Sequence, residues 1–158
     1  MESQILNCGV SHSDSLAKYA AAFFKISHSM RNLMATAVIA HVGDATHFKN
    51  GRDFSAYLGL PPKEHSSGGK QRLLGITKRG NTYLRKLLIQ GGRVVLQWAQ
   101  IKKHSEIGWR KKWLLSIAER RGPFKAAVAQ ANKTARIIWA VLAHQMEYQL
   151  ELDNTYQK

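Results

Sequence analysis

Apolar residues recur every three or four positions along most of the chain, and this spacing predicts a mostly helical protein. The longest such pattern runs from Phe124 through Ala131 to Met146. Gly122 ends the preceding helical pattern, and Pro123 suits the first turn of the next helix. The predicted helices are residues 16–26, 33–42, a short helix capped by Asn50, and longer ones at 81–101, 106–120 and 123–149.

Two predictions about the core follow from the same pattern. Residues 33–42 are apolar almost all round, so we expect a buried helix there. The large aromatic residues of the longer helices fall among other apolar positions, which favours core packing over base stacking. These aromatic residues are Tyr83, Trp98, Trp109, Trp113 and Trp139.

The helical pattern breaks between Gly59 and Asn81. The pair Pro61-Pro62 ends the short helix, because proline offers no amide hydrogen and clashes with a continuing helix. Residues 63–75 predict an ordered loop, in which a small β-ribbon around residues 71–74 is one option. The expected fold class is therefore all-α, with one irregular Gly-rich basic loop. We expect one helical domain at 33–150, a variable lead-in or helix at 1–32 and a flexible tail at 151–158.

Charge narrows the range of partners. The chain has 24 Lys and Arg residues against 10 acidic ones, a net charge of +14, and such a surplus usually faces a polyanion. Nucleic acid is the first candidate, since phosphate neutralisation supplies most sequence-independent affinity, and a ribosome-like or membrane-surface protein is the alternative. A lone Cys8 and scattered histidines predict neither a disulfide framework nor a metal site. Without a membrane span or signal-peptide pattern, we expect a cytoplasmic protein with no membrane partner.

Basic residues gather in and beside the Gly-rich loop. Loop glycines allow backbone N–H groups to approach an anion, and the helix start that follows adds further N–H groups and a positive dipole end. The candidate nucleic-acid-binding residues are Lys63, Lys70, Arg72, Thr77, Lys78, Arg79, Asn81 and Arg85. A purely structural role for Thr77 or Asn81, as the cap of that helix, is compatible with phosphate binding.

The same loop contains two adjacent serines followed by two glycines. Such a run is typical of a turn. A nucleophilic serine needs a base or a cation nearby, together with charge that neutralises the attacked phosphate. His65, Lys70 and Arg72 flank Ser66 and Ser67 in the sequence, so the pattern is compatible with nucleophilic chemistry without establishing it.

Several segments resemble one family, in the same order and at matching spacing. They are Phe48–Pro62, His65–Lys70, Gly75–Asn81 with Tyr83–Arg85, and Arg120–Arg136. Together they extend over about residues 35–143 and resemble the C-terminal domain of the Piv/MooV-like insertion-sequence transposases. These enzymes are recombinases guided by a bridge RNA.

The resemblance implies two cooperating domains. A RuvC-like N-terminal domain would supply four acidic residues that hold Mg²⁺, and the C-terminal domain would supply a serine that joins covalently to DNA. Ser67 directly precedes the first glycine and matches that nucleophile, with Ser66 as the alternative. The resemblance also implies that the basic loop contacts DNA or a guide RNA, and that the protein forms dimers or tetramers.

The chain departs from the family pattern in two places. It lacks a counterpart of the RuvC-like half, so we expect catalysis to need that domain in trans. The family's helix-hairpin-helix has a glycine turn that presents backbone N–H groups to phosphate, and Met30-Arg31-Asn32 replaces that turn here. Two main functions therefore stay open: a catalytic transposase portion that acts through Ser67, and a truncated, non-catalytic nucleic-acid-binding remnant. A basic protein-interaction module ranks third.

Overall fold

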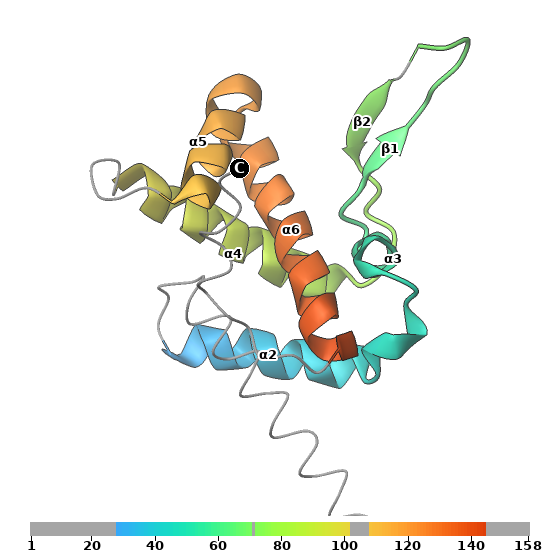
Figure 1. The fold of residues 1–158 in the computed structure, drawn as a ribbon, viewed down its shortest axis with the longest axis vertical. Coiled ribbons are helices and arrows are strands. Elements are labelled where there is room, and N and C mark those ends of the chain that lie inside the picture. Colours follow the sequence, from blue (N-terminus) through green and yellow to red (C-terminus); the bar gives the residue numbers. More distant parts are fainter. Residues whose placement is uncertain (1–27, 71, 102–107, 145–158) are drawn as a thin grey trace, which may run out of the picture.

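The computed structural model describes residues 28–70, 72–101 and 108–144, with side chains from residue 33 onward. The expected all-α fold with one small ribbon is confirmed for these residues (Figure 1). The elements are α2 (His28–Val42), the 3-10 helix η1 (Ala45–His47), α3 (Gly51–Tyr57), β1 (Pro62–Glu64), β2 (Leu73–Ile76), α4 (Thr82–Ile101), α5 (Trp109–Arg121) and α6 (Pro123–His144).

Helix α6 is the centre of the helical body. It packs against α3, α4 and α5, while α2 lies across one end of the body and contacts α4 (Figure 1). The face that α6 turns inward contains Ala131, Ala135 and Ile138, and these residues meet Leu84 and Leu88 of α4 in the main core. Small alanines at the contact let the two helix axes approach closely.

A second, smaller core fixes α5. Leu114 of α5 is buried against Leu96 of α4 and Ala126 of α6. Gly122 then reverses the chain: its φ is +88°, and its N–H donates to the Ala118 carbonyl at the end of α5. Pro123 begins α6, so the predicted boundary between these two helices is confirmed.

Side-chain caps begin α3 and η1 as their sequences suggest. Asn50 accepts hydrogen bonds from the N–H groups of Arg52 and Asp53 at the start of α3. Asp44 accepts from Thr46 N–H at 2.8 Å before η1, and this backbone hydrogen bond lowers the pKa of Asp44 because it favours the charged carboxylate.

The helix expected to be buried at residues 33–42 is buried on one side only. α2 begins at His28, and only the side that packs into the main core is buried, including Met34 and Val38. Leu33 is 44% exposed, because α2 lies at the edge of the body and nothing in the described part of the chain covers its outer side.

Core packing was also the wrong expectation for two aromatic residues of α4. Tyr83 is 45% exposed and Trp98 is 41% exposed, so a large part of each side chain lies at the surface of the described chain. The predicted helix at 16–26 and the predicted helical residues 106–107 and 145–149 lie outside the described residues. No described helix is both long and apolar enough to cross a membrane.

Candidate functional site

The Gly-rich segment is a two-stranded ribbon that extends beside the helical body (Figure 1). β1 and β2 pair antiparallel, with Pro62 opposite Ile76 and Glu64 opposite Leu73. A register shift between the two pairs marks a bulge. The prediction of an ordered loop with a small ribbon is therefore confirmed, although residue 71, at one end of the predicted strand, lies outside the described residues.

The base of the ribbon is a backbone crossing made possible by two glycines. A Cβ atom on Gly80 would overlap the Tyr57 carbonyl oxygen, and one on Gly59 would overlap the backbone of Arg79. Both glycines also have positive φ, at +103° and +70°. The two chains thus touch main chain to main chain, and Lys78 N–H donates to the Gly59 carbonyl at 3.2 Å. This crossing fixes the ribbon to the start of α4.

The tip of the ribbon is a tight turn. Ser67 and Lys70 form an isolated antiparallel bridge, and Lys70 N–H donates to the Ser67 carbonyl at 3.2 Å. The two residues between them, Gly68 and Gly69, have φ values of +59° and +77°. Positive φ at both central positions is the requirement of a type I′ hairpin turn, and glycine meets it without strain. The interpretation of the serine-glycine run as a turn is confirmed.

Pairing across the ribbon assigns side chains to its two faces. Residues directly opposite each other share a face, and so do residues two apart on one strand. Ser67 lies opposite Lys70, and His65 donates its N–H to the carbonyl of Arg72 opposite it. We infer that the Ser67 hydroxyl shares one face with two cations and an imidazole.

The neighbouring serine is engaged elsewhere. Ser66 donates from Oγ to Oε1 of Glu64 at 2.5 Å, which is the contact expected of two residues on the opposite face. Within the described residues the Ser67 hydroxyl makes no hydrogen bond, and its side chain is exposed. The geometry therefore favours Ser67 over Ser66 as the hydroxyl that is open to an incoming phosphate.

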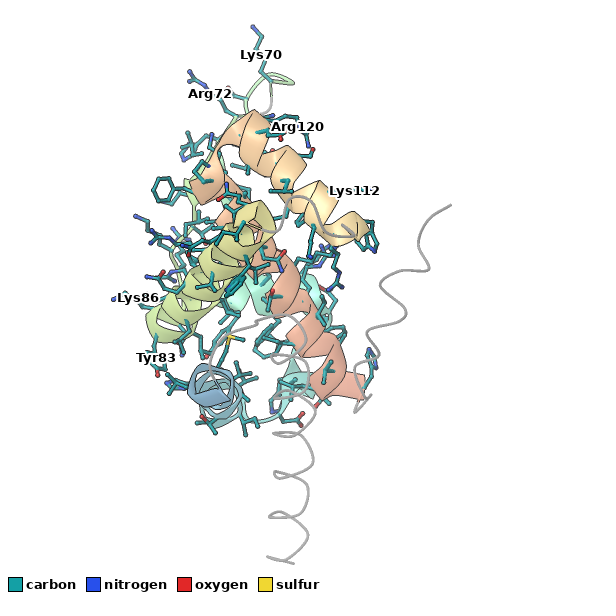
Figure 2. The ribbon with its side chains drawn as sticks, turned by 90° about the vertical axis from the view of Figure 1, so that its left-hand side faces the viewer. Lys70, Arg72, Tyr83, Lys86, Lys112 and Arg120 are labelled. Atoms are coloured by element: carbon teal, nitrogen blue, oxygen red, sulfur yellow. The ribbon has the colours of Figure 1, made fainter. Side chains whose placement is uncertain are left out.

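Most of the predicted binding residues lie on the surface. In Figure 2, Lys70 and Arg72 extend outward at the end of the ribbon. Thr77 is half-buried, and its N–H donates to the Pro61 carbonyl at 2.9 Å. The exposed candidates are Lys63, Lys70, Arg72, Lys78 and Arg79.

Two of the predicted binding residues have structural roles. Asn81 caps α4, because its Oδ1 accepts from Leu84 N–H at 3.0 Å. Arg85 is only 7% exposed, and its guanidinium donates to the Leu58 carbonyl and to Oγ1 of Thr82, each at 3.1 Å. The amphipathic pattern does not reveal this burial, because Arg85 reaches across to a carbonyl 27 positions earlier. We leave Arg85 out of the surface that could contact nucleic acid.

Replacing Arg85 by methionine should destabilise the fold by about 2 kcal/mol, because the buried Leu58 carbonyl loses a charged donor. Urea unfolding followed by tryptophan fluorescence measures this change. The matched control is Lys86→Met on the exposed side of α4, which should cost less than about 0.5 kcal/mol. Equal unfolding midpoints for the two variants would show that the guanidinium contributes nothing.

Comparison of the sequence with known proteins shows which family the chain belongs to. The model of the IS116/IS110/IS902 family of transposases matches residues 27–106, from α2 through the ribbon and all of α4. A probable family 20 transposase of Pseudomonas aeruginosa is 48% identical over 116 residues, which cover 73% of this chain and 33% of that protein. The transposase for insertion sequence element IS1111A of Coxiella burnetii is also 48% identical over 116 residues, covering 73% of this chain and 31% of that protein.

A third relative agrees with these two. The transposase for insertion sequence element IS1328 of Yersinia enterocolitica is 38% identical over 109 residues, covering 69% of this chain and 31% of that protein. The chain spans about a third of the length of these curated relatives. None of the solved protein structures matches it significantly. Since the family model covers half of the sequence, including the whole ribbon, the chain belongs to the IS116/IS110/IS902 family of transposases.

Proposed function

We propose that this chain is the DNA-binding, catalytic C-terminal portion of an RNA-guided insertion-sequence transposase of the Piv/MooV type, and that Ser67 is its nucleophile. The observation that carries the proposal is the ribbon tip. There an exposed serine lies opposite Lys70 on a turn of fixed geometry, and a main-chain crossing fixes the base of the ribbon to the helical body.

In the proposed reaction, Oγ of Ser67 attacks the phosphorus of a DNA phosphodiester. A bond from Oγ to phosphorus forms, and the bond from phosphorus to the oxygen of the departing strand breaks. The serine proton passes to a base, and the departing oxygen takes up a proton, so the exchange needs no further reactant. Lys70 and Arg72, on the same face, would offset the negative charge that gathers on the phosphate oxygens.

The proposed reaction also needs a site for Mg²⁺. Within the described residues, no group of three or more His, Cys, Asp or Glu side chains is placed to hold a metal ion. These residues therefore do not fit the expected Mg²⁺ site. The proposal assigns that site to an acidic RuvC-like domain that would act together with this chain.

The test of the proposal is a covalent protein–DNA adduct. The chain is mixed with the DNA ends of its element, a guide RNA, Mg²⁺ and a RuvC-like domain from a longer relative. The expected product is a slower band on a denaturing gel that disappears when the DNA is digested. DNA ends, guide RNA, the RuvC-like domain and a second copy of the chain are thus the proposed partners.

Nucleic-acid binding should weaken steeply with salt. If the five exposed loop cations contact phosphates, raising the salt from about 50 mM to about 200 mM should lower affinity by about 10²- to 10³-fold. Fluorescence anisotropy with labelled duplex DNA measures the slope of log affinity against log salt. Replacing both Lys70 and Arg72 by glutamine should reduce the slope by about two. An affinity that does not change with salt would contradict the phosphate contacts.

A non-catalytic nucleic-acid-binding protein is the second candidate. The observation in its favour is that no described side chain is hydrogen-bonded to the Ser67 hydroxyl as a base would be. This candidate predicts the same salt dependence but no adduct under any condition, so the adduct experiment separates the two functions.

A further inference from the structure

A groove with a volume of about 1450 Å³ lies between the ribbon and α6. One wall is the ribbon, from Pro62 and from residues 73–76, and the other is the outer face of α6. Figure 1 shows the ribbon standing beside this helix, away from the α4 and α5 sides of the body. The volume exceeds the usual 300–1,000 Å³ of small-molecule sites, which favours a segment of a polymer as occupant.

Among the described residues, the charged side chains that line the groove are all cationic. They are Arg52 at the start of α3 and Lys125, Lys133 and Arg136 on α6. Lys133 already lies over the rings of two tryptophans, with Nζ 3.9 Å from the centroid of Trp109. Within the described part of the chain, the other three form no ion pair with an acidic side chain. The groove is therefore complementary to an anionic polymer.

Exposed apolar side chains line the same groove. Leu73 and Leu74 on the ribbon are 56% and 52% exposed. Phe124, in the first turn of α6, is 73% exposed, although the helical pattern predicted an inward position. The guanidinium of Arg93 lies over its ring, 5.7 Å from the centroid, so Phe124 is an aromatic surface among cations.

Cationic and exposed apolar side chains in one groove suit a single strand of nucleic acid better than a duplex. A duplex presents phosphates outward and keeps its base faces stacked inside, so it offers no base face to an aromatic ring. An unpaired strand offers phosphates to cations and base faces to aromatic rings, and a basic groove with stacking platforms is the usual site for it.

We propose that the groove binds an unpaired nucleic-acid strand, with a base stacked on Phe124 and phosphates on Lys125 and Arg136. The inference rests on the proposed function for its nucleic-acid partner and adds a second site to it. The ribbon tip would act on a phosphodiester, while the groove would hold a displaced DNA strand or an unpaired stretch of guide RNA.

The test measures binding without chemistry. All proteins carry Ser67→Ala, and fluorescence anisotropy is measured at one fixed salt concentration. The labelled probes are single-stranded oligothymidylate, single-stranded oligouridylate and duplex DNA. Each strand has about 20 nucleotides, which is longer than a typical single-strand binding site. Oligothymidylate represents a displaced DNA strand and oligouridylate represents an unpaired stretch of guide RNA, so comparing them separates the two possible sources. The groove variants are Phe124→Leu and the double variant Lys125→Gln with Arg136→Gln. The matched control is Lys112→Gln, a change at an exposed lysine on α5 that does not line the groove.

Phe124→Leu should lower the affinity for at least one single strand by about fivefold or more, while duplex affinity changes by less than about twofold. The double variant should lower single-strand affinity further than the control does. Circular dichroism checks folding, and if Phe124→Leu is unfolded, the double variant decides. Equal losses for single strand and duplex overturn the proposal, as do unchanged affinities, which a groove for a protein segment would give. An absent adduct leaves this binding result intact, so the two failures are distinguishable.

Discussion

Replacing Ser67 by alanine should abolish the covalent protein–DNA adduct, lowering its rate of formation by at least about 10³-fold. The reason is that alanine removes the only atom of this side chain that could bond to phosphorus. Ser67 is exposed at the turn, so the substitution should leave the fold and the noncovalent affinity for DNA unchanged. The measurement is the rate at which the denaturing-gel band appears under the mixture described above, with anisotropy on the same protein.

Ser66→Ala is the matched control. It removes the neighbouring hydroxyl and its hydrogen bond to Glu64, but leaves the Ser67–Lys70 bridge in place. We expect its adduct rate to stay within about tenfold of the parent, a loss that positioning effects can produce. An adduct that survives in Ser67→Ala would refute the nucleophile assignment, and loss in Ser66→Ala alone would transfer the role to Ser66.

Replacing Gly80 by alanine should destabilise the protein by about 3 kcal/mol or more. Two costs add together. The backbone at Gly80 has a φ of +103°, which residues with a side chain rarely adopt, and the new Cβ would overlap the Tyr57 carbonyl oxygen. The main chain at the base of the ribbon would have to separate, and the bond from Lys78 N–H to the Gly59 carbonyl would be disturbed with it. Urea unfolding measures the change.

Gly43→Ala separates the two costs. Gly43 also has a positive φ, at +60°, but a Cβ there would meet nothing within 4 Å. The Gly43→Ala variant should therefore lose only about 1–2 kcal/mol of its free energy of unfolding, which is the cost of placing alanine at a positive φ. If Gly80→Ala is no more destabilising than Gly43→Ala, the close crossing at the base of the ribbon is not a feature of the protein in solution.

The crossing gives a physical reason for the position of the candidate nucleophile. A two-stranded ribbon alone is marginally stable in water, so its tip needs support from elsewhere. Here the support is main chain against main chain at Gly59 and Gly80, where no side-chain rotation can loosen the contact. Gly80→Ala should consequently also slow adduct formation, even at temperatures where the helical body stays folded.

Local sequence was sufficient to predict helix caps and turns, where a single residue supplies the hydrogen bond or the backbone conformation that is needed. Asn50 and Asn81 are caps because a short amide side chain reaches the free N–H groups of a helix start. Gly122-Pro123 divides α5 from α6, and the glycine pair after Ser67 makes the turn, because few other residues adopt positive φ. Helical periodicity also located α4 and α6, because the spacing of apolar residues along the chain shows which side of a helix is apolar.

Periodicity could not reveal what lies opposite each apolar or charged side. Phe124 and Trp98 fit the inward pattern of their helices yet are exposed, because no element of the described chain covers them. Arg85 resembles its exposed basic neighbours but is buried, because the fold brings the Leu58 carbonyl to its guanidinium.

The sequence by itself determined the helices, their caps, the tight turn at Ser67 and the excess of positive charge. Only the tertiary structure decided that the ribbon stands beside α6, that the main chain crosses closely at Gly59 and Gly80, and that Arg52 joins Lys125 and Arg136 along one groove. The physical reason is range. Caps and turns are settled by backbone dihedrals and hydrogen bonds within a few residues. The groove instead arises from the ribbon and α6, whose lining residues are at least 48 positions apart, from Ile76 to Phe124, and meet only when the core has packed.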